Sequence, residues 1–258
     1  MGTLIGSTFR NALCAQFNGV DEHAYCDDPS FKADTAGAWS FWVKLDAVFA
    51  VNDADFIFGY GVRSGSNNSL FHIGPRRIAS TGTSTYMSLV QSSTNGGQIH
   101  GVSGTTTPLG TGWTHVVVQS NGTAWSMWIN GVSQTMTIWY TIGTPLNNGN
   151  WYGDVSGTDH RFTVGVQYVS NAIGANFYAG LLDEVTYLSG RIFTAGEVAS
   201  LYNSGTRTNP RKLASIQADL ETWWRMGESR DNATTIYDEI SSNNLTLVNM
   251  DASNYGTP

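Results

Sequence analysis

Charged residues are scarce in this 258-residue sequence. Asp, Glu, Lys and Arg together make up 13% of the chain, against roughly 25% in an average soluble domain. Apolar residues reach 41%, which is enough to fill the core of one large domain. The polar surface is therefore expected to consist mostly of Ser, Thr, Asn and Gln side chains.

Basic residues are few and scattered, which argues against nucleic acid as a partner. The net charge is −7, and only Arg76-Arg77 and Arg211-Lys212 are adjacent, so no basic stripe exists to displace counterions from phosphates. No apolar run approaches the roughly 20 residues that cross a bilayer. The first residues do not combine a basic region with an apolar stretch, so we expect no signal peptide, no membrane insertion and synthesis in a cytoplasm.

Acidic residues are missing from the middle of the chain, where no Asp or Glu occurs between Asp55 and Asp154. Glycoside hydrolases of the usual kind need two carboxyl groups that flank the scissile bond. The gap removes carboxylates from several central strands and argues against such hydrolysis. The five histidines are dispersed, and no Gly-x-Ser-x-Gly or phosphate-binding motif occurs. We therefore expect a protein that is not an enzyme.

Cysteine is represented by two residues, Cys14 and Cys26. They flank a predicted hairpin whose turn lies near Asn18-Gly19, and such a turn would place them opposite each other. A protein made in a cytoplasm usually keeps its thiols reduced. We expect free thiols, with a disulfide between these two residues as the alternative.

Glycine and aromatic residues are abundant and indicate an all-β protein. The chain has 29 Gly, 9 Trp, 11 Tyr and 11 Phe; aromatic side chains suit a pleated face, and Gly suits tight turns. Short apolar or alternating segments bounded by Gly, Ser or Asn predict many strands. Two successive Asn-Gly turns, at 121–122 and 130–131, predict three antiparallel strands over 113–119, 125–129 and 132–140.

Helix signals occur only near the C-terminus. Thr194 and Glu197 form a capping box that predicts a helix of at most two turns. Asn209-Pro210 predicts the start of a second helix with an apolar face over residues 213–220. A strand is expected to follow at 223–226.

Six short blocks between residues 12 and 203 carry a family pattern. They are Phe17-Asn18-Gly19, Phe41-Trp42-Val43-Lys44, Trp113-Thr114-His115-Val116, Trp128-Ile129-Asn130-Gly131, Gly180-Leu181-Leu182-Asp183-Glu184-Val185 and Glu197-Val198-Ala199-Ser200-Leu201-Tyr202. In this order and spacing they resemble the laminin G-like domains of the concanavalin A-like lectin/glucanase superfamily. The resemblance implies an all-β jelly-roll sandwich of two antiparallel sheets, with short helices near the C-terminus and ligand or partner surfaces on the concave face and rim loops.

Residues 204–258 extend beyond the part that the resemblance covers. We expect 1–203 to form the laminin G-like sandwich and 204–258 a C-terminal tail of helix and strands. Residues 224–249 of this tail look like a segment that often precedes the domain in relatives. The tail is expected to fold back on its own sandwich, or alternatively to complete the sheet edge of a neighbouring subunit.

Two aromatic pairs are candidates for sugar binding. Trp139-Tyr140 and Trp151-Tyr152 flank a loop rich in Asn and Gly at 147–150. A flat ring stacks on the C–H face of a pyranose, while amide groups bond its hydroxyls. The alternative for all four residues is packing in the core or at an interface.

The Asp-Glu pair of the fifth block is a candidate metal site. Relatives often hold a structural ion near this block, so the resemblance makes Asp183 the first candidate ligand for Ca²⁺ and Glu184 the second. Calcium takes carboxylate and carbonyl oxygens. The alternative is that one of the two caps a turn or pairs with an arginine. No cofactor is expected to be required.

Laminin G-like domains with a tail like 234–249 look similar to structural proteins of tailed phages. This resemblance implies a non-enzymatic virion protein, either a capsid decoration or a tail or fibre component, located in the virion. Its partners would be other virion proteins, copies of itself and host-surface glycans. The alternatives are a secreted or cell-surface carbohydrate-binding module, against which the missing signal peptide counts, and a divergent glycoside hydrolase, against which the carboxylate gap counts.

Overall fold

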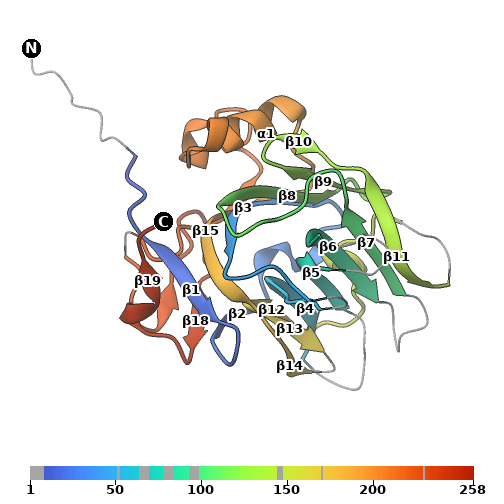
Figure 1. The fold of residues 1–258 in the computed structure, drawn as a ribbon, viewed down its shortest axis with the longest axis horizontal. Helices are drawn as coiled ribbons and strands as arrows, with labels where there is room; N and C mark the ends of the chain where they lie inside the picture. Colours follow the sequence, from blue (N-terminus) through green and yellow to red (C-terminus); the bar gives the residue numbers. More distant parts are fainter. Residues whose placement is uncertain are drawn as a thin grey trace, which may run out of the picture.

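The computed structural model describes residues 9–50, 53–63, 70–77, 84–92, 99–143, 148–169, 171–228 and 230–258. These residues form two large antiparallel sheets, a two-stranded ribbon and one short α-helix (Figure 1). Side chains from both sheets share one hydrophobic core, so the predicted jelly-roll sandwich is confirmed. No helix in the described ranges is long and apolar enough to span a membrane.

The first sheet has eight strands in the order β10-β9-β8-β3-β15-β1-β19, with β16 also paired to β15. Its longest strand, β15, pairs with β3, β1 and β16 and so ties the two ends of the chain together. The strands are β1 Cys14–Asn18, β3 Gly37–Leu45, β8 Thr114–Ser120, β9 Trp125–Ile129, β10 Val132–Ser133, β15 Ala179–Ser189, β16 Leu220–Trp224 and β19 Tyr255–Gly256.

The second sheet has nine strands in the order β11-β7-β6-β5-β4-β12-β2-β18-β17. The ribbon of β13 (Val166–Val169) and β14 (Ala172–Phe177) is separate from both sheets. The strands of the second sheet are β2 His23–Asp27, β4 Phe58–Val62, β5 Leu70–Arg76, β6 Tyr86–Ser92, β7 Ile99–Gly104, β11 Met136–Ile142, β12 His160–Val164, β17 Thr235–Ile236 and β18 Leu245–Val248.

An aromatic stack at the centre of the core joins the two sheets and the tail. Trp39 of β3 stacks on Phe162 of β12, with ring centroids 5.1 Å apart, and on Trp224 of β16, at 5.6 Å. All three side chains are fully buried, and burial of each large side chain contributes about 2–3 kcal/mol. The tail therefore helps to close the core of the sandwich.

The helix α1 (Ala195–Tyr202) packs on the outer side of the eight-stranded sheet. Thr194 caps it, accepting a hydrogen bond from the Glu197 N–H, so the predicted capping box is confirmed. Val198 and Leu201 pack in a small cluster with Leu188 of β15. The prediction of a second helix is wrong. The chain forms only a 3₁₀ turn at Pro210–Lys212 and then forms strand β16 from Leu220 onward.

Two predicted strand pairings are also wrong. β1 and β2 are not a hairpin, because β1 joins the eight-stranded sheet and β2 the nine-stranded one. Cys14 and Cys26 are both buried free thiols. The predicted strand over 132–140 splits after Ser133: β10 pairs with β9, whereas β11 crosses to the other sheet and pairs with β7.

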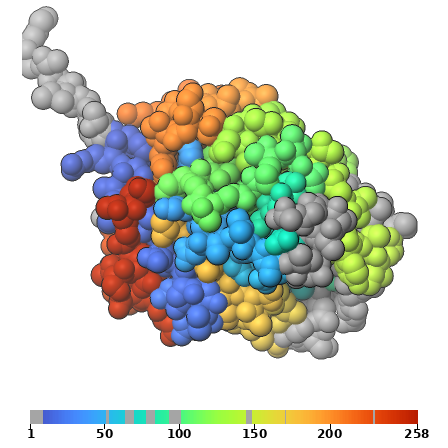
Figure 2. All heavy atoms as spheres, in the orientation of Figure 1, coloured from blue at the N-terminus to red at the C-terminus, as the bar shows by residue number. Residues whose placement is uncertain are grey.

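The C-terminal tail folds back on its own sandwich. β16 pairs with β15, β18 with β2, and β19 with β1. Figure 2 shows the last residues, in red, lying against the blue N-terminal strands on one side of the molecule. Residues 204–258 thus add strands to both sheets instead of forming a separate layer.

Candidate functional site

A groove of about 510 Å³ lies on the outer face of the nine-stranded sheet. Phe71 and Leu89 point into the core from β5 and β6. Because side chains alternate along a strand, the intervening residues, such as Arg76 and Val90, point to the outer face. The described lining residues are Phe56, Leu70, His72, Arg76, Val90, Ser92, Trp139, Tyr140, Gln167 and Val169.

The β13–β14 ribbon forms one wall of the groove, because it packs on the outer face of the sheet at β4 and β5. Gly59 of β4 permits this approach: a Cβ there would lie 2.7 Å from both the backbone nitrogen of Tyr168 and the carbonyl oxygen of Val166. A larger residue would force the ribbon away from the sheet. The ribbon brings Gln167 to the groove, where its Nε2 donates to Asn176 Oδ1 at 3.1 Å.

Strand β11 forms the opposite wall through Trp139, which lies against Gly101 of β7. A Cβ at Gly101 would come within 2.5 Å of the indole ring. The guanidinium of Arg76 lies over the same indole, with its Cζ 3.9 Å from the ring centroid, which is close enough for a cation–π interaction. One face of Trp139 therefore supports the arginine and is not open to a sugar.

Tyr140 provides the open aromatic surface of the groove. Its ring stacks beside Trp139, with centroids 5.9 Å apart and an interplanar angle of 25°. The tyrosine is 46% exposed, so its ring can pack against the apolar face of a ligand. The first predicted pair, Trp139-Tyr140, thus lies at a groove, with a supporting role for one ring and an open surface on the other.

The second predicted pair, Trp151-Tyr152, lies in the core, and its prediction as a sugar contact is wrong. The two residues are 0% and 1% exposed. Trp151 Nε1 donates to Tyr187 Oη at 2.9 Å, and Tyr152 Oη accepts from Trp39 Nε1 at 2.6 Å. Both polar ends are satisfied inside the sandwich, as buried Trp and Tyr require, and no face remains for a ligand.

The charge of the groove comes from Arg76. His72 is buried in its floor, where its Nε2 donates to the carbonyl oxygen of Tyr168 at 3.1 Å. Burial lowers the pKa of His72 to about 4, so its ring is neutral at neutral pH. The described lining contains no Asp or Glu. This part of the groove therefore offers one cation and no carboxylate pair of the kind that glycoside hydrolysis requires.

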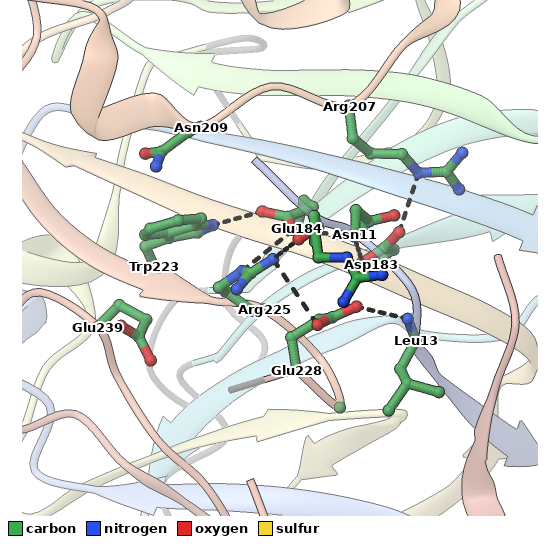
Figure 3. A network of polar contacts seen from close by, with 12 residues as sticks. Asn11, Leu13, Asp183, Glu184, Arg207, Asn209, Trp223, Arg225, Glu228 and Glu239 are labelled. Carbon is green, nitrogen blue, oxygen red and sulfur yellow. Dashed lines mark hydrogen bonds and ion pairs between the residues drawn. The ribbon is translucent and has the colours of Figure 1, made fainter. Parts of the chain in front are cut away.

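A second polar cluster, the carboxylate network, lies at a bulge in β15 and consists of Asn11, Asp183, Glu184, Arg207 and Arg225 (Figure 3). The register between β15 and β3 shifts after Asp183, and Glu184 adopts a left-handed φ of +48°. The bulge turns two consecutive side chains to the same side. There Asn11 Nδ2 donates to Asp183 Oδ1 at 3.1 Å and to Glu184 Oε1 at 2.9 Å.

Both predicted metal ligands belong to this network, and the groups around them do not fit a calcium ion. Arg207 pairs with Asp183 at 2.9 Å, and Arg225 pairs with Glu184 at 3.4 Å. Two guanidinium groups already supply the positive charge that a cation would bring. Among the described residues, no group of three or more His, Cys, Asp or Glu side chains could hold a metal. The alternative of pairing with arginine is what the structure shows for both residues.

Burial controls the protonation of the carboxylate network. It raises the pKa of Asp183 to about 6 and that of Glu184 to about 8. The charge of Asp183 raises the pKa of Glu184 further, whereas Arg225 and the hydrogen bond from Trp223 Nε1, at 2.6 Å, lower it. The network joins the segment before β1, strand β15 and the tail, so its role is structural.

Arg76 is the groove residue that sequence reasoning missed. Its signal was present: in β5, the positions 70, 72, 74 and 76 alternate with the buried Phe71 and Ile73. An arginine at the outward position of such a strand is a candidate for a ligand contact. Its partner Trp139 is 63 positions away along the chain, and that contact has no local signal.

Comparison with solved structures finds the same jelly-roll fold in other proteins. A Bacteroides ovatus protein described as carbohydrate-binding matches with a TM-score of 0.59 and 17% identity, over 100% of this chain and 65% of that one. The sialidase module CBM40 of Ruminococcus gnavus, bound to α2,3-sialyllactose, gives 0.54 and 12%, over 73% and 97%. A heptameric SAP-like pentraxin of Limulus polyphemus gives 0.52 and 13%, over 76% and 84%. At these identities the likeness is one of fold.

No family model matches the sequence, and no curated protein matches it either.

Proposed function

We propose that this chain is a carbohydrate-binding protein and that the groove on the nine-stranded sheet is its sugar-binding site. The observation that carries the proposal is the exposed ring of Tyr140 beside an arginine that Trp139 holds in place. An open aromatic ring next to a few fixed polar groups is the usual composition of a sugar-binding surface.

The fold supports this class of ligand. The Bacteroides ovatus protein is described as carbohydrate-binding, and the Ruminococcus gnavus module is bound to α2,3-sialyllactose. One scaffold hosts many activities, so the side chains of the groove must carry the assignment. Here Tyr140 supplies an apolar platform, and Gln167, whose amide is oriented by Asn176, supplies hydrogen bonds to hydroxyls.

Binding without hydrolysis is part of the proposal. The described lining of the groove has no carboxylate to act as acid, base or nucleophile. The carboxylates of Asp183 and Glu184 are engaged by Arg207 and Arg225 in a separate network. A glycan bound in the groove would therefore be held and released unchanged.

The virion role inferred from the sequence stays a prediction. A lectin-like fold suits glycan contact by a phage particle and by a secreted or cell-surface module alike. Mass spectrometry of purified particles, counting copies of this chain per major capsid subunit, separates the two. Hundreds of copies per particle would indicate a capsid decoration and a handful a tail or fibre component, whereas none would favour the module.

The sugar-binding proposal is tested by Tyr140→Ala on a broad glycan array, followed by calorimetric titration with the glycans that bind. Loss of the stacking surface is expected to weaken binding about tenfold or more. The matched control is Ile142→Ala, because Ile142 lies two residues further along β11, is also exposed, and does not line the groove. An array on which the unmodified protein binds nothing, or equal binding by both variants, would overturn the proposal.

A further inference from the structure

Arg76 differs from most of the other partly buried arginines because it forms no ion pair with a carboxylate of the described residues. Its Nε is buried without a hydrogen-bond acceptor. Asp53 is the acidic residue whose charge acts on it, and the two do not form an ion pair. Arginines that do pair with carboxylates, within the described chain, are Arg63, Arg161, Arg191, Arg207, Arg211, Arg225 and Arg230.

The position of Arg76 is nevertheless well defined. Its guanidinium lies flat over Trp139, which in turn lies against Gly101. Stacking leaves the N–H groups at the rim of the guanidinium plane free to donate in that plane, and such a planar fork matches the two oxygens of a carboxylate. A fixed, partly desolvated cation that pairs with no carboxylate of the described ranges is therefore ready to receive an anion from solution.

We infer that the groove takes an acidic sugar, whose carboxylate pairs with Arg76 while its ring packs on Tyr140. The inference rests on the proposed carbohydrate-binding function and names the ligand class: glycans that carry a carboxylate, as sialic and uronic acids do. Tyr140 and Arg76 both contact Trp139, so one sugar residue can reach the tyrosine ring and the guanidinium together.

A carboxylated glycan fits better than a highly sulfated one. Among the described lining residues, Arg76 is the single cation, because His72 is neutral at neutral pH. Polyanionic chains are bound by several cations at once, and their binding depends steeply on salt. One guanidinium suits one carboxylate on an otherwise neutral sugar.

The experiment compares Arg76→Gln with the unmodified protein on matched pairs of glycans. The probes are 3′-sialyllactose against lactose, and trigalacturonate against its methyl ester, with heparin as the sulfated arm. We expect the unmodified protein to prefer at least one acidic member over its neutral partner. R76Q should weaken that binding about tenfold to a hundredfold and should weaken binding of the neutral partner by a smaller factor. Arg10→Gln is the control, because Arg10 is exposed and this substitution removes the same charge away from the groove.

The outcomes separate this inference from the function on which it rests. Binding of neutral glycans with no preference for the acidic members would overturn the acidic-sugar assignment and leave the sugar-binding site standing. Binding of heparin alone would overturn the carboxylate assignment. An acidic preference that R76Q and R10Q reduce equally would show a general charge effect and would also overturn it. Absence of any glycan binding would remove both proposals.

Discussion

Arg76 in the groove and Arg207 in the carboxylate network are held in similar ways but have different surroundings. Arg207 lies 4.1 Å from the ring centroid of Trp113, and Arg76 lies 3.9 Å from that of Trp139. Arg207 also pairs with the fully buried Asp183, whereas no carboxylate in the described part of the chain pairs with Arg76. Stacking fixes the position of both cations, but of the two it is Arg207 whose charge is neutralised by a carboxylate of the fold.

The presence or absence of a carboxylate partner distinguishes a structural cation from one that is available to a ligand. A buried ion pair joins distant segments and costs the fold heavily when one partner is removed. An unpaired cation contributes little to the fold, because its stacking energy is offset by the loss of water.

Removal of Asp183 should have the largest effect. The variant Asp183→Ala leaves Arg207 partly buried without its carboxylate, and we expect a loss of about 3–5 kcal/mol in the free energy of unfolding. Urea denaturation measures it, with Asp46→Ala as the control, because Asp46 is exposed and should change stability by less than about 0.5 kcal/mol. Similar losses in both variants would show that the network is not structural.

Glu184 should make stability depend on pH. Its folded pKa of about 8 lies above the ordinary value of 4.5, so the fold favours the protonated form. The stability that protonation provides is full below pH 4.5 and is lost as the pH rises towards 8. We expect Glu184 to contribute a decline of roughly 2–4 kcal/mol from pH 5 to pH 8, and Glu184→Gln, whose amide mimics the protonated acid, to lack that contribution.

The measurement is the difference in unfolding free energy between the two proteins at each pH. The difference is needed because buried His72 and His115 have lowered pKa values and act in the opposite direction as the pH falls. Their contribution is common to both proteins and cancels. Parallel pH profiles for the unmodified protein and E184Q would contradict the prediction.

Arg76→Gln should have the smallest effect on the fold. No carboxylate that the structure describes forms an ion pair with Arg76, so we expect the unfolding free energy to stay within about 0.5 kcal/mol of the original value. Thermal and urea denaturation without ligand give the measurement, and Arg207→Gln serves as the structural counterpart that should lose much more. If R76Q and R207Q lost similar amounts, the contrast between the two arginines would fail.

Local signals in the sequence predicted several elements and two residues of the candidate site. The capping box of Thr194 and Glu197 starts α1 as expected, because both hydrogen bonds lie within four residues. Apolar segments with turn residues at their ends became β3, β8 and β9. The pair Trp139-Tyr140 was found from its aromatic rings, but nothing local indicated that one ring would carry Arg76. The same aromatic signal made Trp151-Tyr152 a candidate pair, but both residues lie in the core. Their burial depends on packing against the opposite sheet, which the local sequence does not show.

The aromatic and glycine content, the turn signals and the alternating segments are enough to specify short antiparallel strands. The sheet that each strand joins depends on the packing of the whole chain, and β1 and β2, although adjacent in the chain, separate into different sheets. The same packing decides the partner of each arginine. Asn11 meets Glu184 across 173 positions, and such contacts depend on how the whole chain packs, which no local pattern of side chains records.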